Sequence, residues 1–481
     1  VPIGGVFAPP TTPRACRAGT MRAGAGRLVT TASRAVWISR LVVLALSGAW
    51  PSVTSAQQRD STAHDRWQRT LDSLAARLAR TDSALTLLQQ QVATEAASGV
   101  RLRSRLQLDL SARLVVHASG TRGGVSAAEI PVFATPARAA GGGNARPQVF
   151  GMSMRQALLG GSASMDSVAG ATLLADFELD FFARALDASP PLFPEPRLRT
   201  ARVFLVWPRT EVLLGMETPL IADLNPVSTA GVAIPLFAAA GNLWNWLPQL
   251  RVTRTLATRG EWAMAAQGAV LSPNASERPL GATSGGADLG QASGRPALQS
   301  RVRLRHGTDL DERAAQAVWT SGMEIGVGAH AAWLRTAPAN TLRSWAIAAD
   351  VHAALGHGVE VRGEAYRGAL VRGLGGGGIG QNFGTLGVPA GGTGPPLTGT
   401  AGWLQLNGQW HPSLVHGMGC GTDRVHGAGA DRRRNGVCAL HTTWRPAMPL
   451  FVSLEYRRLR TRYADGLWRA QHWNLAFGVD L

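Results

Sequence analysis

The sequence predicts an all-β fold: a transmembrane antiparallel β-barrel of about 16 strands, preceded by a short N-terminal α-helical coiled coil. Three observations predict it: an export leader, a single heptad-repeat segment, and apolar and polar side chains that alternate with period two beyond residue 100. We therefore divide the chain into a leader and signal peptide (1–56), a coiled-coil segment (57–99) and a barrel (100–481).

Composition excludes several other classes of protein. Of the 481 residues, 45% are hydrophobic and 16% are charged, so the chain can bury a large core and is not disordered. The longest apolar run, 41–50, is about half of the roughly 20 residues that a membrane-spanning helix needs. All 48 basic residues are Arg and they are spread along the chain, so the formal charge of +17 predicts no nucleic-acid partner.

The leader has the three parts of a secretory signal peptide. A basic stretch from Met21 precedes an apolar core at 41–46, and small residues follow up to Ala56. We expect cleavage after Ala56, which makes Gln57 the first residue of the mature chain. Residues 1–20 are then an over-called start or an extended leader.

A heptad seam follows the leader. The segment between Asp60 and Ala97 contains no Gly or Pro, and apolar side chains recur at alternating spacings of four and three residues. The seam contains Trp67, Leu71, Leu74, Leu78, Leu85, Leu88 and Val92. Such a seam can be buried against its own domain or against a second copy. We favour self-association, because no second helical segment of similar quality occurs in the chain.

The remaining chain contains sixteen candidate strands, an even number, as single-chain bacterial outer-membrane barrels require. They begin near residues 101, 148, 167, 197, 210, 248, 260, 296, 323, 343, 358, 402, 413, 436, 449 and 470. The last alternates up to the terminal residue, Leu481, as C-terminal strands of outer-membrane proteins commonly do.

The connections alternate in length, as in a membrane barrel with turns at one end and loops at the other. We expect short connections at 160–166, 208–209, 411–412 and 445–449, and long ones at 118–146, 218–247, 273–295, 371–401 and 421–435. Trp207, Trp410 and Trp444 each precede a short turn that contains Pro, which is typical of an aromatic girdle at the membrane interface, although Trp in an ordinary core is the alternative.

If the apolar face meets lipid, the opposite face points into the barrel. The residues that we expect to line a pore are Arg101, Arg103, Arg105, Asp176, Glu178, Asp180, Arg251, Arg301, Arg303, Arg305, Glu360, Arg362, Glu364 and Arg457. Opposed basic and acidic ladders would set up a transverse field that orients solutes, whereas ion pairs within the barrel would leave only polar faces. Both alternatives remain open at this stage.

The third long loop, 218–247, is unusually apolar for an exposed segment. We expect it to fold into the lumen as a constriction, or otherwise to cover a contact between subunits. Its candidate residues, counted from the end of the preceding strand, are Glu217, Asp223, Asn225, Trp244 and Trp246.

Motifs for other chemistry are absent or weak. The chain has no H-E-x-x-H, G-x-S-x-G or Walker motif, and a formal G-x-G-x-x-G at 373–378 lies in a Gly-rich loop that no helical pattern follows. In an exported chain we expect a disulfide between Cys420 and Cys438. These two could instead ligate a metal with His426 and His441, but the spacing fits no tight zinc motif. We expect no cofactor and no resident metal.

The order of signal peptide, coiled coil and barrel resembles porins of the DcaP type, and the barrel also resembles the phosphate-selective porins O and P. The segments that carry the resemblance are 215–219 (GMETP), 400–406 (TAGWLQL) and 454–458 (LEYRR). Such porins are trimers with a periplasmic coiled coil, which agrees with the heptad seam. Phosphate-selective relatives also use Lys, which this chain lacks.

Two classes of function follow from these observations. The first is a passive, water-filled porin in the outer membrane of a Gram-negative-type bacterium, with no enzymatic activity and a lumen that Arg biases toward small anions. Its partners would be its own copies in a homotrimer, outer-membrane lipid with lipopolysaccharide, and small anionic solutes. The second is a barrel without transport, either an enzyme or a structural anchor for the cell wall. About sixteen strands leave an aqueous lumen, which favours the first class.

Overall fold

The computed structural model describes residues 107–136, 148–183, 194–277, 286–307, 318–388 and 393–481. The predicted leader, the coiled-coil segment 57–99 and the first Arg ladder (Arg101, Arg103 and Arg105) lie outside the described residues, so these predictions remain untested.

The described residues form one antiparallel sheet of 17 strands. The strands are β1 (Gln107–Arg122), β2 (Gln148–Ser153), β3 (Leu158–Val168), β4 (Ala171–Asp180), β5 (Arg197–Trp207), β6 (Thr210–Glu217), β7 (Leu247–Arg259), β8 (Trp262–Leu271), β9 (Ala297–His306), β10 (Met323–Ala337), β11 (Asn340–Gly356), β12 (Val359–Ala369), β13 (Thr398–His411), β14 (Leu414–His426), β15 (Arg432–Trp444), β16 (Leu450–Tyr463) and β17 (Leu467–Asp480). Short helical turns occur at η1 (Gln291–Ser293), η3 (Arg372–Leu374) and α3 (Gly377–Gly380). Within the described ranges, no helix is long and apolar enough to cross a membrane.

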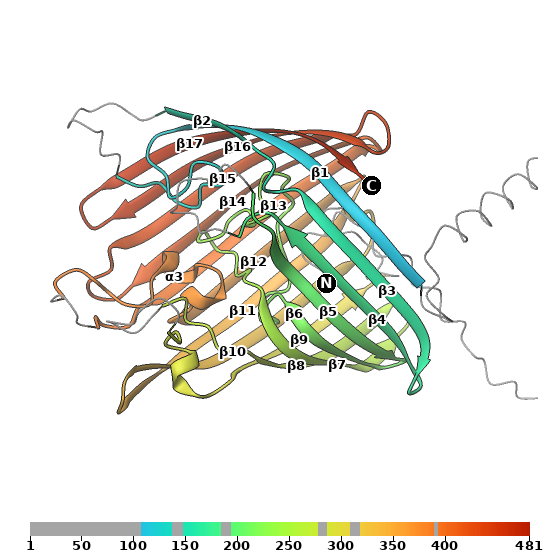
Figure 1. Cartoon of the computed structure of the whole chain (residues 1–481), viewed down its shortest axis with the longest axis horizontal. Helices are drawn as coiled ribbons and strands as arrows, with labels where there is room; N and C mark the ends of the chain where they lie inside the picture. Colours follow the sequence, from blue (N-terminus) through green and yellow to red (C-terminus); the bar gives the residue numbers. More distant parts are fainter. Residues whose placement is uncertain (1–106, 137–147, 184–193, 278–285, 308–317, 389–392) are drawn as a thin grey trace, which may run out of the picture. The chain divides into compact units, whose positions relative to one another are not determined.

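The 17 strands occupy 16 positions around a closed barrel, and the predicted strand number is confirmed. Both β2 and β3 pair with β1, one along each half of it, so they are two parts of one interrupted strand. The sheet closes because β17 pairs with β1 from Arg113↔Asp480 to Arg122↔Gln471. A closed sheet has no free edge that could pair with another chain. Figure 1 shows the strands wrapping obliquely around the barrel.

The connections lie at two ends, which we call the turn end and the loop end. Two-residue turns join β3 to β4, β5 to β6, β7 to β8, β11 to β12 and β13 to β14 at the turn end, whereas the longest connections, among them 218–246 and 370–397, lie at the loop end. Not every connection obeys this rule, since 307–322 is long at the turn end and 338–339 is short at the loop end.

Two predicted connections are wrong, and a third, 118–146, begins too early because β1 extends to Arg122. Residues 160–166 belong to β3, where Gly161 makes room for the Phe177 ring: a Cβ at this position would lie 2.8 Å from it. The turn is instead at 169–170. Residues 421–435 belong largely to β14 and β15, which a connection of only five residues, 427–431, joins. Both segments are rich in Gly and polar residues, which a barrel strand tolerates where its inward side chains are polar.

The two faces of the sheet differ in polarity, and the arrangement is the reverse of that in a water-soluble β-protein. Large apolar side chains point outward and are exposed on strands all around the barrel, for example Leu214, Val327, Ile347, Leu404 and Phe477. Buried polar and charged side chains alternate with them along the same strands and point inward. The alternation that the sequence shows is therefore an apolar exterior around a polar interior, as in membrane barrels.

Aromatic side chains gather at the turn end. Trp207, Trp410 and Trp444 end their strands there as predicted, and Trp262 adds a fourth from β8. Trp410 is 71% exposed and Trp444 50% exposed, so these rings are not core residues. Their position matches that of the interfacial aromatic girdle of membrane barrels.

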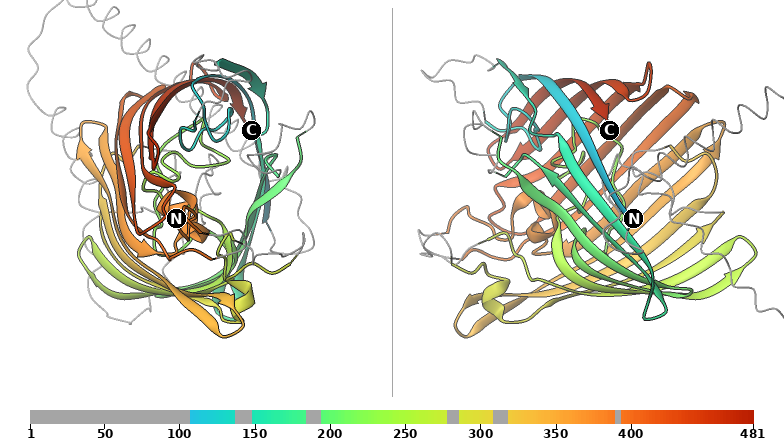
Figure 2. Two further views of the ribbon diagram at one scale, coloured as in Figure 1. Left: turned by 90° about the vertical axis from the view of Figure 1, so that its left-hand side faces the viewer. Right: turned by 45° about the vertical axis from the view of Figure 1, so that its right-hand side comes forward.

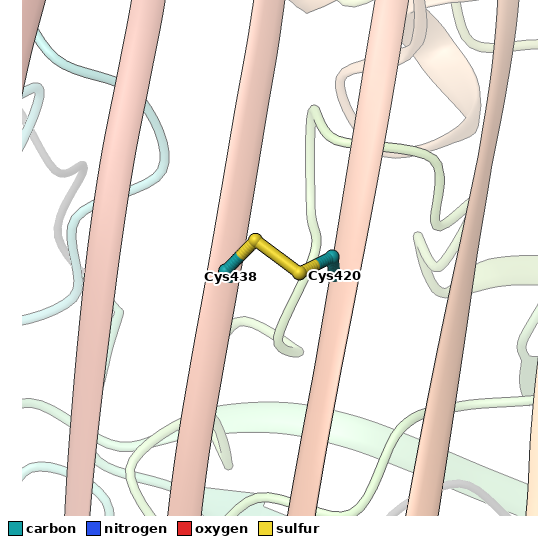
Figure 3. Close-up of a disulfide and its surroundings, with 2 residues drawn as sticks. All are labelled: Cys420 and Cys438. Atoms are coloured by element: carbon teal, nitrogen blue, oxygen red, sulfur yellow. A yellow bond between two sulfur atoms is a disulfide. The ribbon is translucent and has the colours of Figure 1, made fainter.

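A disulfide joins Cys420 on β14 to Cys438 on β15 (Figure 3). The two residues stand directly opposite each other in the β14–β15 ladder, and their Cα atoms are 4.1 Å apart. Their neighbours two positions along, Met418 and Leu440, are exposed on the outer face, which places the disulfide on that face.

Candidate functional site in the barrel interior

The connection 218–246, which we call the lumen loop, crosses the barrel interior. It leaves β6 and returns to β7, yet it also makes hydrogen bonds to β13 and β16 on other parts of the wall. Nearly all of its residues are buried, unlike those of an ordinary surface loop. Figure 2 shows green loop segments inside the ring of strands.

Inward side chains of β7 and β9 hold the beginning of the lumen loop. Gln249 Nε2 donates to the Thr218 carbonyl oxygen at 2.8 Å, and Arg251 Nη2 donates to the same oxygen at 2.8 Å. The Ile221 backbone N–H donates to Gln299 Oε1 at 3.1 Å. Because every group in these contacts is buried, they satisfy backbone polar atoms that water cannot reach.

The middle of the lumen loop is held by β13 and β16. Gln405 accepts a hydrogen bond from the Val227 N–H at 2.7 Å and donates to the Val227 carbonyl oxygen at 2.8 Å. Ser228 Oγ donates to Glu455 at 2.6 Å, and Arg457 Nη2 donates to Ser228 Oγ at 3.3 Å. Arg457 Nε also donates to Glu455 at 2.6 Å, so one buried ion pair holds the loop.

The acidic ladder of β4 is neutralised by its neighbour β5. The ion pairs are Asp176 with Arg202, Glu178 with Arg199, and Asp180 with Arg197. Of the two alternatives that the sequence left open, ion pairs within the barrel apply here, and the ladder does not depend on cations across the lumen.

The same β5 arginines reach the lumen loop. Arg197 Nη2 donates to the Ala233 carbonyl oxygen and Arg199 Nη2 to that of Val232, each at 2.9 Å. Their guanidinium carbons lie 5.2 and 4.9 Å from the centre of the Trp246 ring, within cation–π distance. The charged wall of β4 and β5 therefore fixes the second half of the loop.

The Arg ladder of β9 faces carboxylates on β10 and β11. Arg301 donates to Asp350 at 2.7 and 2.9 Å and to Glu324 at 3.0 Å, and Arg305 Nε donates to Glu324 at 2.5 Å. Arg301 is buried, whereas Arg303 and Arg305 are partly exposed. The ladder thus presents cationic groups beside carboxylates rather than an uncompensated positive wall.

On β12 the three predicted residues also point inward. Arg362 Nε donates to Glu360 at 2.6 Å, which makes a buried ion pair. Glu364 accepts from the Leu243 N–H of the lumen loop and from Trp403 Nε1, both at 3.3 Å. This strand therefore contributes both a charged pair and a further attachment point for the loop.

The predicted loop residues occupy different surroundings. Glu217 accepts hydrogen bonds from the Thr218 N–H and hydroxyl, and Asn225 accepts one from Asn242 Nδ2 at 2.9 Å. Trp244 lies edge-on to Trp246, with ring centres 5.2 Å apart. The predicted residues of the lumen loop are therefore packed along the loop with separate partners and do not form one cluster.

Asp223 lies in the lumen loop 3.8 Å from Arg251. Asp223 is buried, and Arg251 of β7 supplies a positive charge beside its carboxylate.

Sequence reasoning missed several inward charged residues that complete the site. They are Arg197, Arg199, Glu324, Asp350 and Glu455, each paired with a residue described above. A signal existed, because each lies on a predicted strand and the period of two assigns it to the inner face.

The alternative metal site at the cysteines is excluded by geometry. Both thiols form the outward disulfide, whereas His441 points inward and lies 3.0 Å from Asn407. In the described ranges, no group of three or more His, Cys, Asp or Glu side chains is arranged to hold a metal ion.

The chain resembles solved structures of outer-membrane channels and porins. No protein-family model and no curated protein matches the chain. Among solved structures, the outer membrane channel DcaP of Acinetobacter baumannii matches with a TM-score of 0.58 and 13% identity, over 80% of this chain and 99% of that chain. The anion-selective porin from Comamonas acidovorans (TM-score 0.47, 9% identity) covers 78% of this chain and 100% of that one. OprB of Pseudomonas putida matches with a TM-score of 0.47 and 9% identity, over 78% of this chain and 94% of that chain.

At such identities the likeness concerns the fold. The chain shares the barrel architecture of DcaP across nearly the whole length of that channel. The predicted resemblance to DcaP-type porins is confirmed at this level.

Proposed function

We propose that this chain is an outer-membrane porin, a passive water-filled channel for small solutes. The observation that carries the proposal is the inverted barrel, in which exposed apolar side chains surround a buried polar interior. Sixteen-stranded barrels of this kind leave room for an aqueous lumen, which barrels of about eight strands do not. The lumen loop would form the constriction, as its contacts with several walls suggest.

The preferred solutes are small anions. On β7 to β11 and the adjoining part of the lumen loop, four inward arginines (Arg251, Arg301, Arg303 and Arg305) face three carboxylates (Asp223, Glu324 and Asp350). Arg303 and Arg305 are the less buried members and would meet a passing solute. Fixed charge in a narrow, partly desolvated pore acts more strongly than the same charge in bulk water.

The experiment that tests the proposal is single-channel recording of the refolded mature chain in a planar bilayer of zwitterionic lipid. We expect stepwise conductance and, under a salt gradient, a reversal potential biased toward anions. A correctly folded barrel without conductance would contradict the porin function and favour an enzyme or a cell-wall anchor. Conductance with a cation bias would contradict only the preference for anions.

We further propose that the porin is a homotrimer whose coiled coil lies in the periplasm. The support is the heptad seam of the segment 57–99. Replacing Leu74, Leu78 and Leu85 by Gln should loosen the trimer in detergent, measured as a fall in mass by light scattering. Gln at the neighbouring flank positions Arg77, Arg80 and Thr86 is the matched control, since flank residues do not enter the seam. Equal masses for both variants would contradict a role of the seam.

A further inference from the structure

Six arginines form a basic patch on the outer face of β14 to β17. The patch comprises Arg424, Arg434, Arg458, Arg460, Arg462 and Arg469, all of them exposed. Cross-strand register brings them together: Arg434 stands opposite both Arg424 and Arg462, and Arg460 stands opposite Arg469. Like charges side by side repel each other, so a patch of this kind indicates an anionic partner.

The described part of the chain offers this patch no counter-charge. Among the described residues, no ion pair involves any of the six arginines, whereas Arg457 on the inner face of β16 is paired with Glu455. By the alternation of side chains, every carboxylate on the described strands has the parity of the inner face or lies at a strand end. The described strands of a second copy therefore offer the patch no complementary carboxylates on their outer face, which favours a molecule of another kind.

An apolar depression adjoins the patch and makes the surface amphipathic. One hollow is lined by Arg434, Arg458 and Arg460 together with Gly402 and Gly436, whose missing side chains leave space beside the arginines. A second hollow is lined by Leu404, Leu406, Met418, Leu440 and Tyr456. The two hollows share the disulfide and Arg458, so they form one groove with a cationic end and an apolar end.

Five of the six arginines lie within three residues of the loop end of their strands, whereas Arg458 stands opposite Cys438 in the middle of β15. Arg434 lies near the start of β15 at the loop end, and Trp444 closes the same strand at the turn end. Outward side chains between them include Cys438 and Leu440. Arginine is costly in the hydrocarbon layer and tolerated at headgroup level, so the five arginines near the loop end belong with headgroups on the side of the long loops.

We propose that this groove binds a lipid with a multiply phosphorylated headgroup and several acyl chains, the chemistry of the lipid A part of lipopolysaccharide. The guanidinium groups would donate charge-assisted hydrogen bonds to the phosphates, and the apolar end would take an acyl chain. The inference rests on the proposed outer-membrane location and not on solute transport.

The test uses the refolded mature chain in zwitterionic detergent and measures the Kd for bisphosphorylated lipid A by native mass spectrometry. The patch variant carries Arg434→Gln, Arg460→Gln and Arg462→Gln. A cationic residue at a charged lipid surface contributes about fivefold in affinity, so the triple variant should bind on the order of a hundredfold more weakly. The matched control is Arg254→Gln, Arg335→Gln and Arg343→Gln, three outward arginines on β7, β10 and β11, and we expect its affinity to stay within about twofold.

Three outcomes would overturn the inference. The first is equal loss, or no loss, in the patch and control variants when both keep the heat-modifiable gel mobility of a folded barrel. The second is equally tight binding of lipid A from which the phosphates have been removed. The third is equally tight binding of inorganic phosphate alone, which would make the patch a site for free phosphate. A barrel that conducts but does not bind lipid A contradicts only this inference, and one that binds it without conducting contradicts only the porin.

Discussion

Arg457 and Arg458 are neighbours in sequence but point to opposite faces of β16. Arg457 points into the barrel, is 2% exposed, and is paired with Glu455 two residues earlier on the same strand. Arg458 points outward, is exposed, and has no ion-pair partner among the described residues. Because side chains of a strand alternate between its faces, one step along β16 moves an arginine from the polar interior to the outer surface.

The difference teaches that arginine has two separate uses in this barrel. Inward arginines such as Arg199, Arg251 and Arg457 lie beside carboxylates and donate hydrogen bonds to the lumen loop, so they belong to the folded interior. The outward patch contributes no contact of that kind and is available to the surroundings. The formal charge of +17 can therefore not be assigned to the lumen alone.

The largest expected effect comes from breaking an interior pair. Glu455→Gln leaves the buried Arg457 without its counter-ion, and leaving one buried charge unpaired costs about 3–5 kcal/mol in free energy of unfolding. Arg458→Gln on the outer face should change it by less than about 0.5 kcal/mol. Denaturant unfolding in detergent, followed by tryptophan fluorescence, measures both. Equal losses would show that the two faces do not differ as described.

A second effect concerns the outer face, where the disulfide links β14 to β15. The cysteines are separated by 18 positions, and opening a loop of this size lowers the free energy of unfolding by about 3 kcal/mol on the chain-entropy model. We expect this loss for the Cys420→Ser, Cys438→Ser variant and no further loss on adding a reductant. A reductant that still destabilises the double variant would contradict the assignment, because no other thiol remains in the mature chain.

Much of the fold follows from the period of two, and the errors have a physical reason. Alternation assigned the inner face correctly for Asp176, Arg251, Arg301 and Arg362, since the rule needs no knowledge of partners. It failed at 160–166, where Gly and Ser resemble a turn although Gly161 is needed beneath Phe177.

Pairing could not be predicted from one strand alone. Arg301 meets Asp350, 49 residues away, because β9 and β11 flank β10 in a particular register. The two-residue turn at 338–339 fixes the register of β10 against β11, but no such turn joins β9 to β10, which the long connection 307–322 separates in sequence. The basic patch could not be predicted for the same reason, because its arginines come from four strands and only the register brings them together.

The smallest effect is on selectivity, and it distinguishes the two uses of arginine directly. Arg303 is the suitable inward position because it is partly exposed, whereas Arg301 is buried between two carboxylates. One charge at roughly 10 Å from a solute contributes about 1 kcal/mol in a partly desolvated pore, so Arg303→Gln should lower the anion-to-cation permeability ratio about fivefold. Arg460→Gln lies on the outer face and should leave the ratio unaltered. Reversal potentials under a salt gradient measure both, and an equal shift in the two variants would mean that the field of the whole barrel, and not its inner face, selects the solute.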